Sequence, residues 1–128
     1  MGNQNTPMKN AITAQQLDTL TWNISRIIRC IDLAFIFKSN WEAYSCINDA
    51  VSELEQANGL ISSAALSSKD GQAVKIAEAQ KCLLWADGFI TEALSVISQH
   101  QDQGAVSNLV AGRKAIWEEA KSLKSLLA

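Results

Sequence analysis

Residues 74–97, VKIAEAQKCLLWADGFITEALSVI, decide the fold, because their apolar side chains recur at helical spacing along two separate stripes. The main stripe advances in alternating steps and consists of Ile76, Ala79, Leu83, Ala86, Ile90, Ala93 and Ile97. The second stripe lies on the opposite side of the same helix and consists of Val74, Cys82, Trp85, Phe89 and Val96. One apolar stripe is typical of a helix on the rim of a bundle. Two stripes predict a helix that is buried between layers or covered by a binding partner.

The rest of the chain contains further segments with apolar residues at helical spacing. Together with the first stretch they predict helices over residues 13–38, 41–66, 71–100 and 105–127. Residues suited to helix capping precede these segments, namely Thr13, Ser39 (in a capping box with Glu42), Asp70 and Asp102. Asn58–Gly59 and Asp87–Gly88 resemble turns, but the stripes keep their phase through both pairs. We therefore expect continuous helices, with a kink at Asn58–Gly59 as the alternative.

Alanine occurs at every seventh position of the second and third predicted helices, and larger aliphatic residues fill the other core position. Small residues at one heptad position let antiparallel helices approach closely. Because the connections are short, the sequence predicts an all-α, antiparallel, up-down-up-down four-helix bundle. This single domain covers residues 12–128, and the polar residues 1–11 are expected to be disordered or loosely packed.

The fourth predicted helix buries a stripe that includes Leu109, Ile116 and Leu123. Val110 and Trp117 are expected to widen this buried face. Gly112 falls on the same side, where the missing side chain would let another helix approach closely.

Composition argues against several classes of partner. The 128 residues carry a formal net charge of −2, and acidic and basic side chains are interspersed. Binding to nucleic acid needs clustered basic residues, so we expect no nucleic-acid partner. The most apolar run contains Asp32 and is too short to cross a bilayer, and the first dozen residues are polar, unlike a signal peptide. We expect no membrane association and a cytoplasmic location.

The opening residues MGNQNT match the myristoylation pattern through Gly2 and Thr6. The pattern is short and matches often by chance, and a single myristoyl chain binds membranes only marginally. A polar, unmodified start is the simpler interpretation.

Side chains suited to catalysis or metal binding are scarce. The one histidine, His100, lies at a predicted helix end and lacks the glutamate three residues earlier that a di-iron bundle requires. Cys30, Cys46 and Cys82 are odd in number and fall inside predicted helices, which indicates core or interface thiols in a reducing compartment. We therefore predict no catalytic residues, no cofactor, no metal site and no enzymatic activity.

Three charged residues lie at the edges of the predicted core, namely Asp32, Asp87 and Arg113. The simpler interpretation is that they reach solvent or pair locally, as Arg29 and Asp32 can do at a spacing of three. The alternative is that Asp32 or Asp87 pairs with Arg113 across helices and fixes the helix register.

Surplus apolar surface gives the main indication of function. Trp22 and Trp85 lie opposite the main stripes of their helices, and exposed tryptophan is a frequent interface anchor, whereas Trp41 and Trp117 are expected in the core. The competing structural explanation is that the N-terminal segment or a fifth short element buries these two tryptophans. The predicted interface comprises Val74, Cys82, Trp85, Phe89 and Val96 on the third helix and Trp22, Leu33 and Phe37 on the first.

From this surface we expect a non-enzymatic protein–protein interaction module that binds another protein. Examples are a small regulator, an inhibitor or anti-activator, or a secretion-type chaperone of a bacterium or phage. Homodimerisation is the simplest way to cover the surface. The alternatives are a structural or assembly subunit and a small-ligand-binding bundle with Asp87 and Arg113 as its polar groups.

Overall fold

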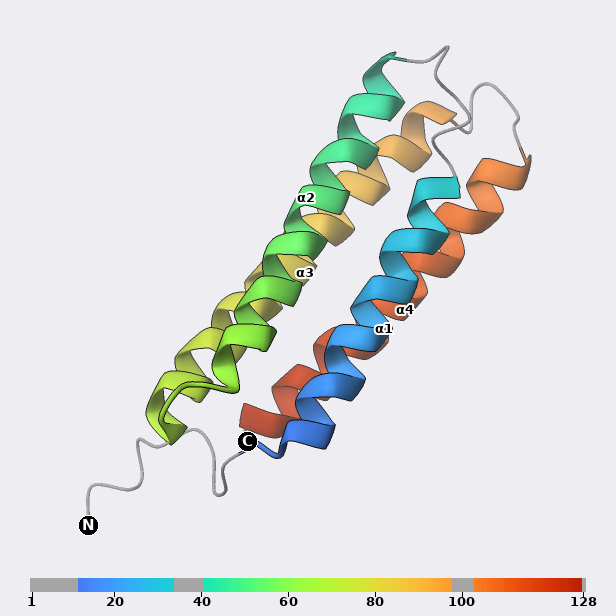
Figure 1. Ribbon diagram of the computed structural model, residues 1–128. Coiled ribbons are helices and arrows are strands. Elements are labelled where there is room, and N and C mark those ends of the chain that lie inside the picture. Colours follow the sequence, from blue (N-terminus) through green and yellow to red (C-terminus); the bar gives the residue numbers. More distant parts are fainter. Residues whose placement is uncertain (1–11, 34–40, 98–102, 128) are drawn as a thin grey trace.

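The computed structural model describes residues 12–33, 41–97 and 103–127, and this part of the chain folds into four helices. They are α1 (Ala14–Asp32), α2 (Trp41–Ala64), α3 (Lys69–Ile97) and α4 (Gln103–Leu127). Successive helices run in opposite directions, with α2 beside α3 and α1 beside α4 (Figure 1). Both α1 and α3 pack against α2 and α4, so α1 and α3 occupy opposite corners. The predicted all-α, antiparallel four-helix bundle is confirmed.

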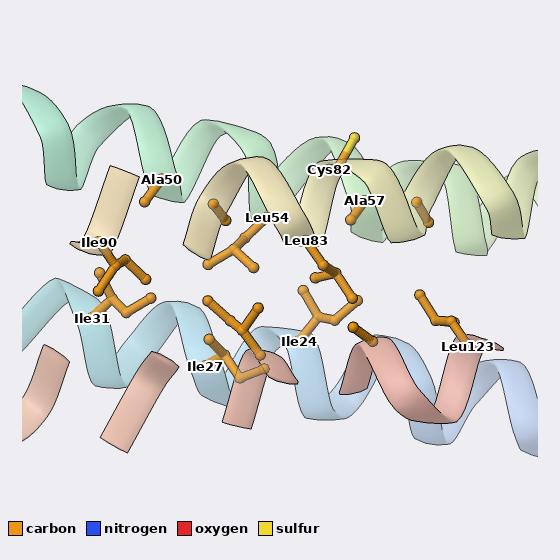
Figure 2. Close-up of a cluster of buried hydrophobic side chains, with 14 of the residues drawn as sticks. Ile24, Ile27, Ile31, Ala50, Leu54, Ala57, Cys82, Leu83, Ile90 and Leu123 are labelled. Carbon is orange, nitrogen blue, oxygen red and sulfur yellow. The ribbon is translucent and has the colours of Figure 1, made fainter. Parts of the chain in front are cut away.

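The core is an aliphatic layer between the four helices (Figure 2). The four alanines at heptad spacing in α2 are fully buried, and so are the alanines of the α3 stripe. Leu54 of α2 and Leu83 of α3 point toward Ile24 and Ile27 of α1 (Figure 2). The α2–α3 pair makes the most extensive contact between helices, as small side chains at every seventh position predict.

Thr13 caps α1, as predicted. Its Oγ1 accepts a hydrogen bond from the Gln16 amide at 3.1 Å, and its own amide donates to Gln16 Oε1 at 2.9 Å, which completes a capping box. The preceding residue, Ile12, is buried, and its amide donates to Oε1 of the buried Gln72 side chain at 3.0 Å. Because Gln72 belongs to α3, this bond fixes the entry to α1 against the opposite corner of the bundle.

The predicted N-cap of α3, Asp70, is wrong. Ser68 takes that position: its Oγ accepts from the Gly71 amide at 3.2 Å, and its carbonyl accepts from the Gln72 amide at 2.8 Å. The tight turn after α2 brings Ser68 to the helix start two residues earlier than the sequence pattern indicated. Asp70 lies in the first turn of α3, where its carboxylate still interacts favourably with the helix dipole.

The turn-like pairs Asn58–Gly59 and Asp87–Gly88 do not interrupt α2 or α3, so the predicted continuity is confirmed. Gly112 is buried, and a Cβ built on it would lie 2.9 Å from Ile31 Cγ1, which confirms the predicted close approach. The buried face of α4 is narrower than predicted, because Val110 and Trp117 are exposed on its flank.

Several predictions concern residues outside the described ranges. They are the loose N-terminal segment 1–11 with its Gly2–Thr6 pattern, the end of the first helix at residue 38, the Ser39 capping box, and the roles of His100 and Asp102. The side chain of Trp41 also lies outside the described part of the structure.

Candidate functional site

Tryptophans dominate the exposed apolar surface of the described helices. Trp85 on α3 is 64% exposed, Trp22 on α1 is 58% exposed and Trp117 on α4 is 50% exposed. Tryptophan is mostly buried in folded domains and enriched at protein interfaces. The prediction that Trp22 and Trp85 lie outside the core is confirmed, whereas the predicted burial of Trp117 is wrong.

The second stripe of α3 does not form one continuous exposed surface. Val74 and Trp85 are well exposed, whereas Phe89 and Val96 are partly buried and pack against the core. The rings of Trp85 and Phe89 are tilted by 32° with centroids 6.3 Å apart. Cys82 is buried, so it belongs to the core rather than to the predicted interface. Its position between α2 and α3 explains this, since α2 covers that flank of α3.

The apolar back of α1 is a separate surface. Trp22 and Leu33 are exposed there, and the Arg26 guanidinium lies 4.9 Å from the centre of the Trp22 ring. Because α1 and α3 occupy opposite corners, their outward faces point in opposite directions. The structure therefore does not bring the two predicted halves of the interface together. Phe37, the last member of the α1 group, lies outside the described residues.

A polar cluster joins α3 to α4. Arg113 Nε donates to Asp87 Oδ1 at 2.9 Å, which confirms that Asp87 pairs with Arg113 across helices. Trp117 Nε1 donates to the same oxygen at 2.9 Å. These bonds satisfy the groups that we considered as the polar part of a ligand site, and they hold the Trp117 ring on the flank of α4.

This cluster enlarges the apolar surface of α3. Leu84 lies one helical turn before Asp87 and is 49% exposed, and Trp85 is its neighbour in the chain. Val110 lies two turns before Trp117 on the same flank of α4. We call Leu84, Trp85, Val110 and Trp117 the α3–α4 surface. Trp85 lies at its α2 side, where it borders a hollow together with Gln56 and Leu60 of α2. The sequence pattern missed Leu84, because it belongs to neither stripe of the helix.

The thiols of Cys46 and Cys82 are not activated. Burial and a hydrogen bond to Glu92, with Sγ and Oε2 3.3 Å apart, raise the pKa of Cys46 to about 11. Burial and the nearby Glu53 carboxylate raise the pKa of Cys82 to about 11 as well. A nucleophilic cysteine needs a lowered pKa, so neither thiol has the environment of a catalytic group.

One buried charged residue, Glu119 on α4, was not expected from the sequence pattern. It is only 4% exposed, and burial raises its pKa to about 7. The amide of Asn23 on α1 donates to Glu119 Oε1 at 3.2 Å. The sequence spacing does indicate that residue 119 is buried, because it follows Gly112 and Ile116 at core spacing and precedes Leu123 by one turn.

Within the described ranges, no group of three histidine, cysteine, aspartate or glutamate side chains is placed to hold a metal ion. None of the helices in that part of the chain is both long and apolar enough to cross a membrane. Comparison with protein-family models, curated proteins and solved structures gave no match to this chain.

Proposed function

We propose that this protein is a non-enzymatic interaction module that binds another protein through the α3–α4 surface. The observation that carries the proposal is the exposure of four large apolar side chains on two neighbouring helices, Leu84 and Trp85 on α3 and Val110 and Trp117 on α4. Aromatic residues at the centre of an interface contribute a large share of its binding energy. A small regulator, an inhibitor or anti-activator, or a secretion-type chaperone acting in the cytoplasm would use such a surface.

A second copy of the chain is the simplest partner. In a two-fold dimer the same surface lies on both subunits, so one apolar patch on each chain is sufficient. The proposed homodimer uses the α3–α4 surface alone, because the α1 face with Trp22 points away from it. Asp87 and Arg113 would lie inside this contact and fix the position of the Trp117 ring.

The opposed apolar faces favour an assembly subunit as the second candidate. If the α1 face of one copy contacts the α3–α4 surface of the next, the contact is heterologous and repeats without closing. Such an assembly grows with concentration, whereas a two-fold dimer does not. A substitution on the α1 face should therefore disrupt the assembly and leave the two-fold dimer intact.

Sedimentation velocity at micromolar concentration tests both candidates with three variants. Trp85→Glu changes the α3–α4 surface, Trp22→Glu changes the α1 face, and Leu66→Glu is the matched control. Leu66 is 94% exposed in the turn between α2 and α3, away from both faces. Circular dichroism of each variant verifies that the helices are retained.

A two-fold dimer predicts that Trp85→Glu gives a monomer, while Trp22→Glu and Leu66→Glu remain dimeric. An assembly subunit predicts larger species that both tryptophan variants abolish. A wild-type protein that remains monomeric up to about 100 µM, where a contact of equal Kd contributes only about 5.5 kcal/mol, would exclude both self-associating forms. Binding to a different protein then requires a purified partner that loses affinity for Trp85→Glu and not for Leu66→Glu.

A further inference from the structure

A groove of about 470 Å³ lies between α1 and α4. Its volume is within the range of small-molecule sites, roughly 300 to 1,000 Å³. The walls are small or apolar where Ile27 of α1 faces Ala111 and Ala115 of α4. This groove is distinct from the α3–α4 surface, because it lies on the other flank of α4.

Glu119 forms part of the groove lining and is almost fully buried. One carboxylate oxygen, Oε1, accepts from Asn23 Nδ2 at 3.2 Å. The other, Oε2, is buried and has no hydrogen-bond partner among the described residues. A buried polar atom without a partner is unfavourable for folding, and such atoms are rare in folded proteins. A hydrogen-bond donor that enters the groove would satisfy Glu119 Oε2.

The charges around the groove favour a cation as that donor. Glu118 adds a second carboxylate to the α4 wall. The Arg26 side chain also lines the groove, but its guanidinium lies 4.9 Å from the centre of the Trp22 ring, on the outward side of α1. An anion in the groove would be repelled by the carboxylates of Glu118 and Glu119. A metal ion would need several protein ligands, and the described residues offer no group of three that could supply them.

We propose that the α1–α4 groove binds a small organic cation with a primary ammonium group and a short aliphatic body. The ammonium nitrogen donates to Glu119 Oε2, and the aliphatic body packs against Ile27, Ala111 and Ala115. A charge-assisted hydrogen bond in a buried position is stronger than one between neutral groups. This inference is independent of the proposed protein-binding surface.

The protonation state of Glu119 gives the proposal a directional test. Burial raises its pKa to about 7, although the bond from Asn23 lowers it. The other titratable or charged groups that line the groove are Arg26 and Cys30 from α1 and Glu118 from α4. An ammonium ligand requires the carboxylate form, so its affinity is expected to rise between pH 6 and pH 8. A ligand that accepts a hydrogen bond from the protonated Glu119 carboxyl would show the opposite dependence.

The experiment titrates the 128-residue chain with a series of primary alkylammonium ions, from methylammonium to hexylammonium, using isothermal calorimetry and amide chemical shifts. n-Butanol and acetate serve as neutral and anionic probes. Two variants test the site: Glu119→Gln removes the charge but keeps the shape, and Ala115→Leu fills the groove but keeps Glu119. Trp85→Glu is the control for independence from the protein-binding surface.

Saturable binding of at least one ammonium ion is expected, with shifts centred on α1 and α4. Both site variants should weaken it at least about tenfold, the equivalent of losing one charge-assisted bond. Trp85→Glu should bind normally, which separates failure of this proposal from failure of the protein-binding one. Absence of saturation for every ion, equal binding by Glu119→Gln, or affinity that falls as pH rises would each overturn it.

Discussion

Replacing glycine by alanine should have opposite effects at two helical positions of this bundle. At Gly59 the added Cβ meets nothing within 4 Å, so only the backbone effect remains. Alanine is more favourable than glycine in a helix interior by about 1 kcal/mol, so Gly59→Ala should stabilise by about that amount. At Gly112 the same Cβ would lie 2.9 Å from Ile31 Cγ1. No carbon pair tolerates this distance, so the neighbour must move.

The movement is expensive because Ile31 is completely buried and branched at Cβ. Its Cγ1 atom lies close to the backbone, and the χ1 angle that positions this atom has one strongly preferred rotamer in a helix. Overpacking in a well-packed core costs about 1–3 kcal/mol. After the helix gain of about 1 kcal/mol is included, Gly112→Ala should be neutral to destabilising by about 2 kcal/mol.

Urea denaturation followed by circular dichroism measures both free energies of unfolding. The helix term is common to the two variants, so their difference isolates the steric term, expected at about 1–3 kcal/mol. Ile31→Ala in the Gly112→Ala background should cost less than in the wild type by a similar amount, because the obstructing atom is gone. Equal stability of Gly112→Ala and Gly59→Ala would refute the close approach of α1 and α4 at this point.

Three further predictions concern stability. Glu119→Gln should be as stable as the wild type near pH 4.5 and more stable than the wild type by up to about 3 kcal/mol near pH 8. The raised pKa of about 7 means that folding favours the protonated acid of the wild type, and this contribution to stability is lost as the pH rises to 7. A free energy of unfolding that is independent of pH in both proteins would contradict this prediction. Arg113→Met should lower the melting temperature slightly, because Asp87 keeps only the Trp117 donor; unchanged or higher stability would count against a role in helix register. Thr13→Ala should destabilise by about 1 kcal/mol through loss of the cap, whereas Thr19→Ala, within α1 and exposed, serves as a control that should not.

Periodicity was sufficient to predict the architecture because the core repeats it so strictly. The alternation of alanine with isoleucine or leucine in α2 and α3 leaves one way to bury both stripes, as the burial of Leu54 and Leu83 shows. Helix boundaries were less accessible. Asp70 and Ser68 are both good caps, and only the geometry of the turn after α2 selects Ser68.

Exposure at the edges of helices was harder to predict than burial at their centres. Periodicity places Cys82 and Trp85 on one stripe, yet the neighbouring helix α2 covers the first and leaves the second exposed. Trp117 was expected to widen the buried face of α4, whereas its indole nitrogen bonds to Asp87 on the bundle surface. Which flank of a helix is covered depends on the corner it occupies, and a single sequence does not contain that information.

At Glu119 the residue type does not match the apolar pattern of the helix, and such mismatches are expected at functional or strained sites. Its position in the heptad calls for an apolar residue, and the corresponding positions of α2 and α3 hold alanine, isoleucine or leucine. A leucine there would fill space next to Ala115 and remove a buried acceptor that Asn23 only half satisfies. Since apolar replacement of a buried, incompletely paired charge is usually neutral or stabilising, fold stability alone does not explain the glutamate. The α1–α4 groove is therefore the part of this bundle whose sequence is least explained by folding, and the Glu119→Gln titration separates a binding role from a purely structural one.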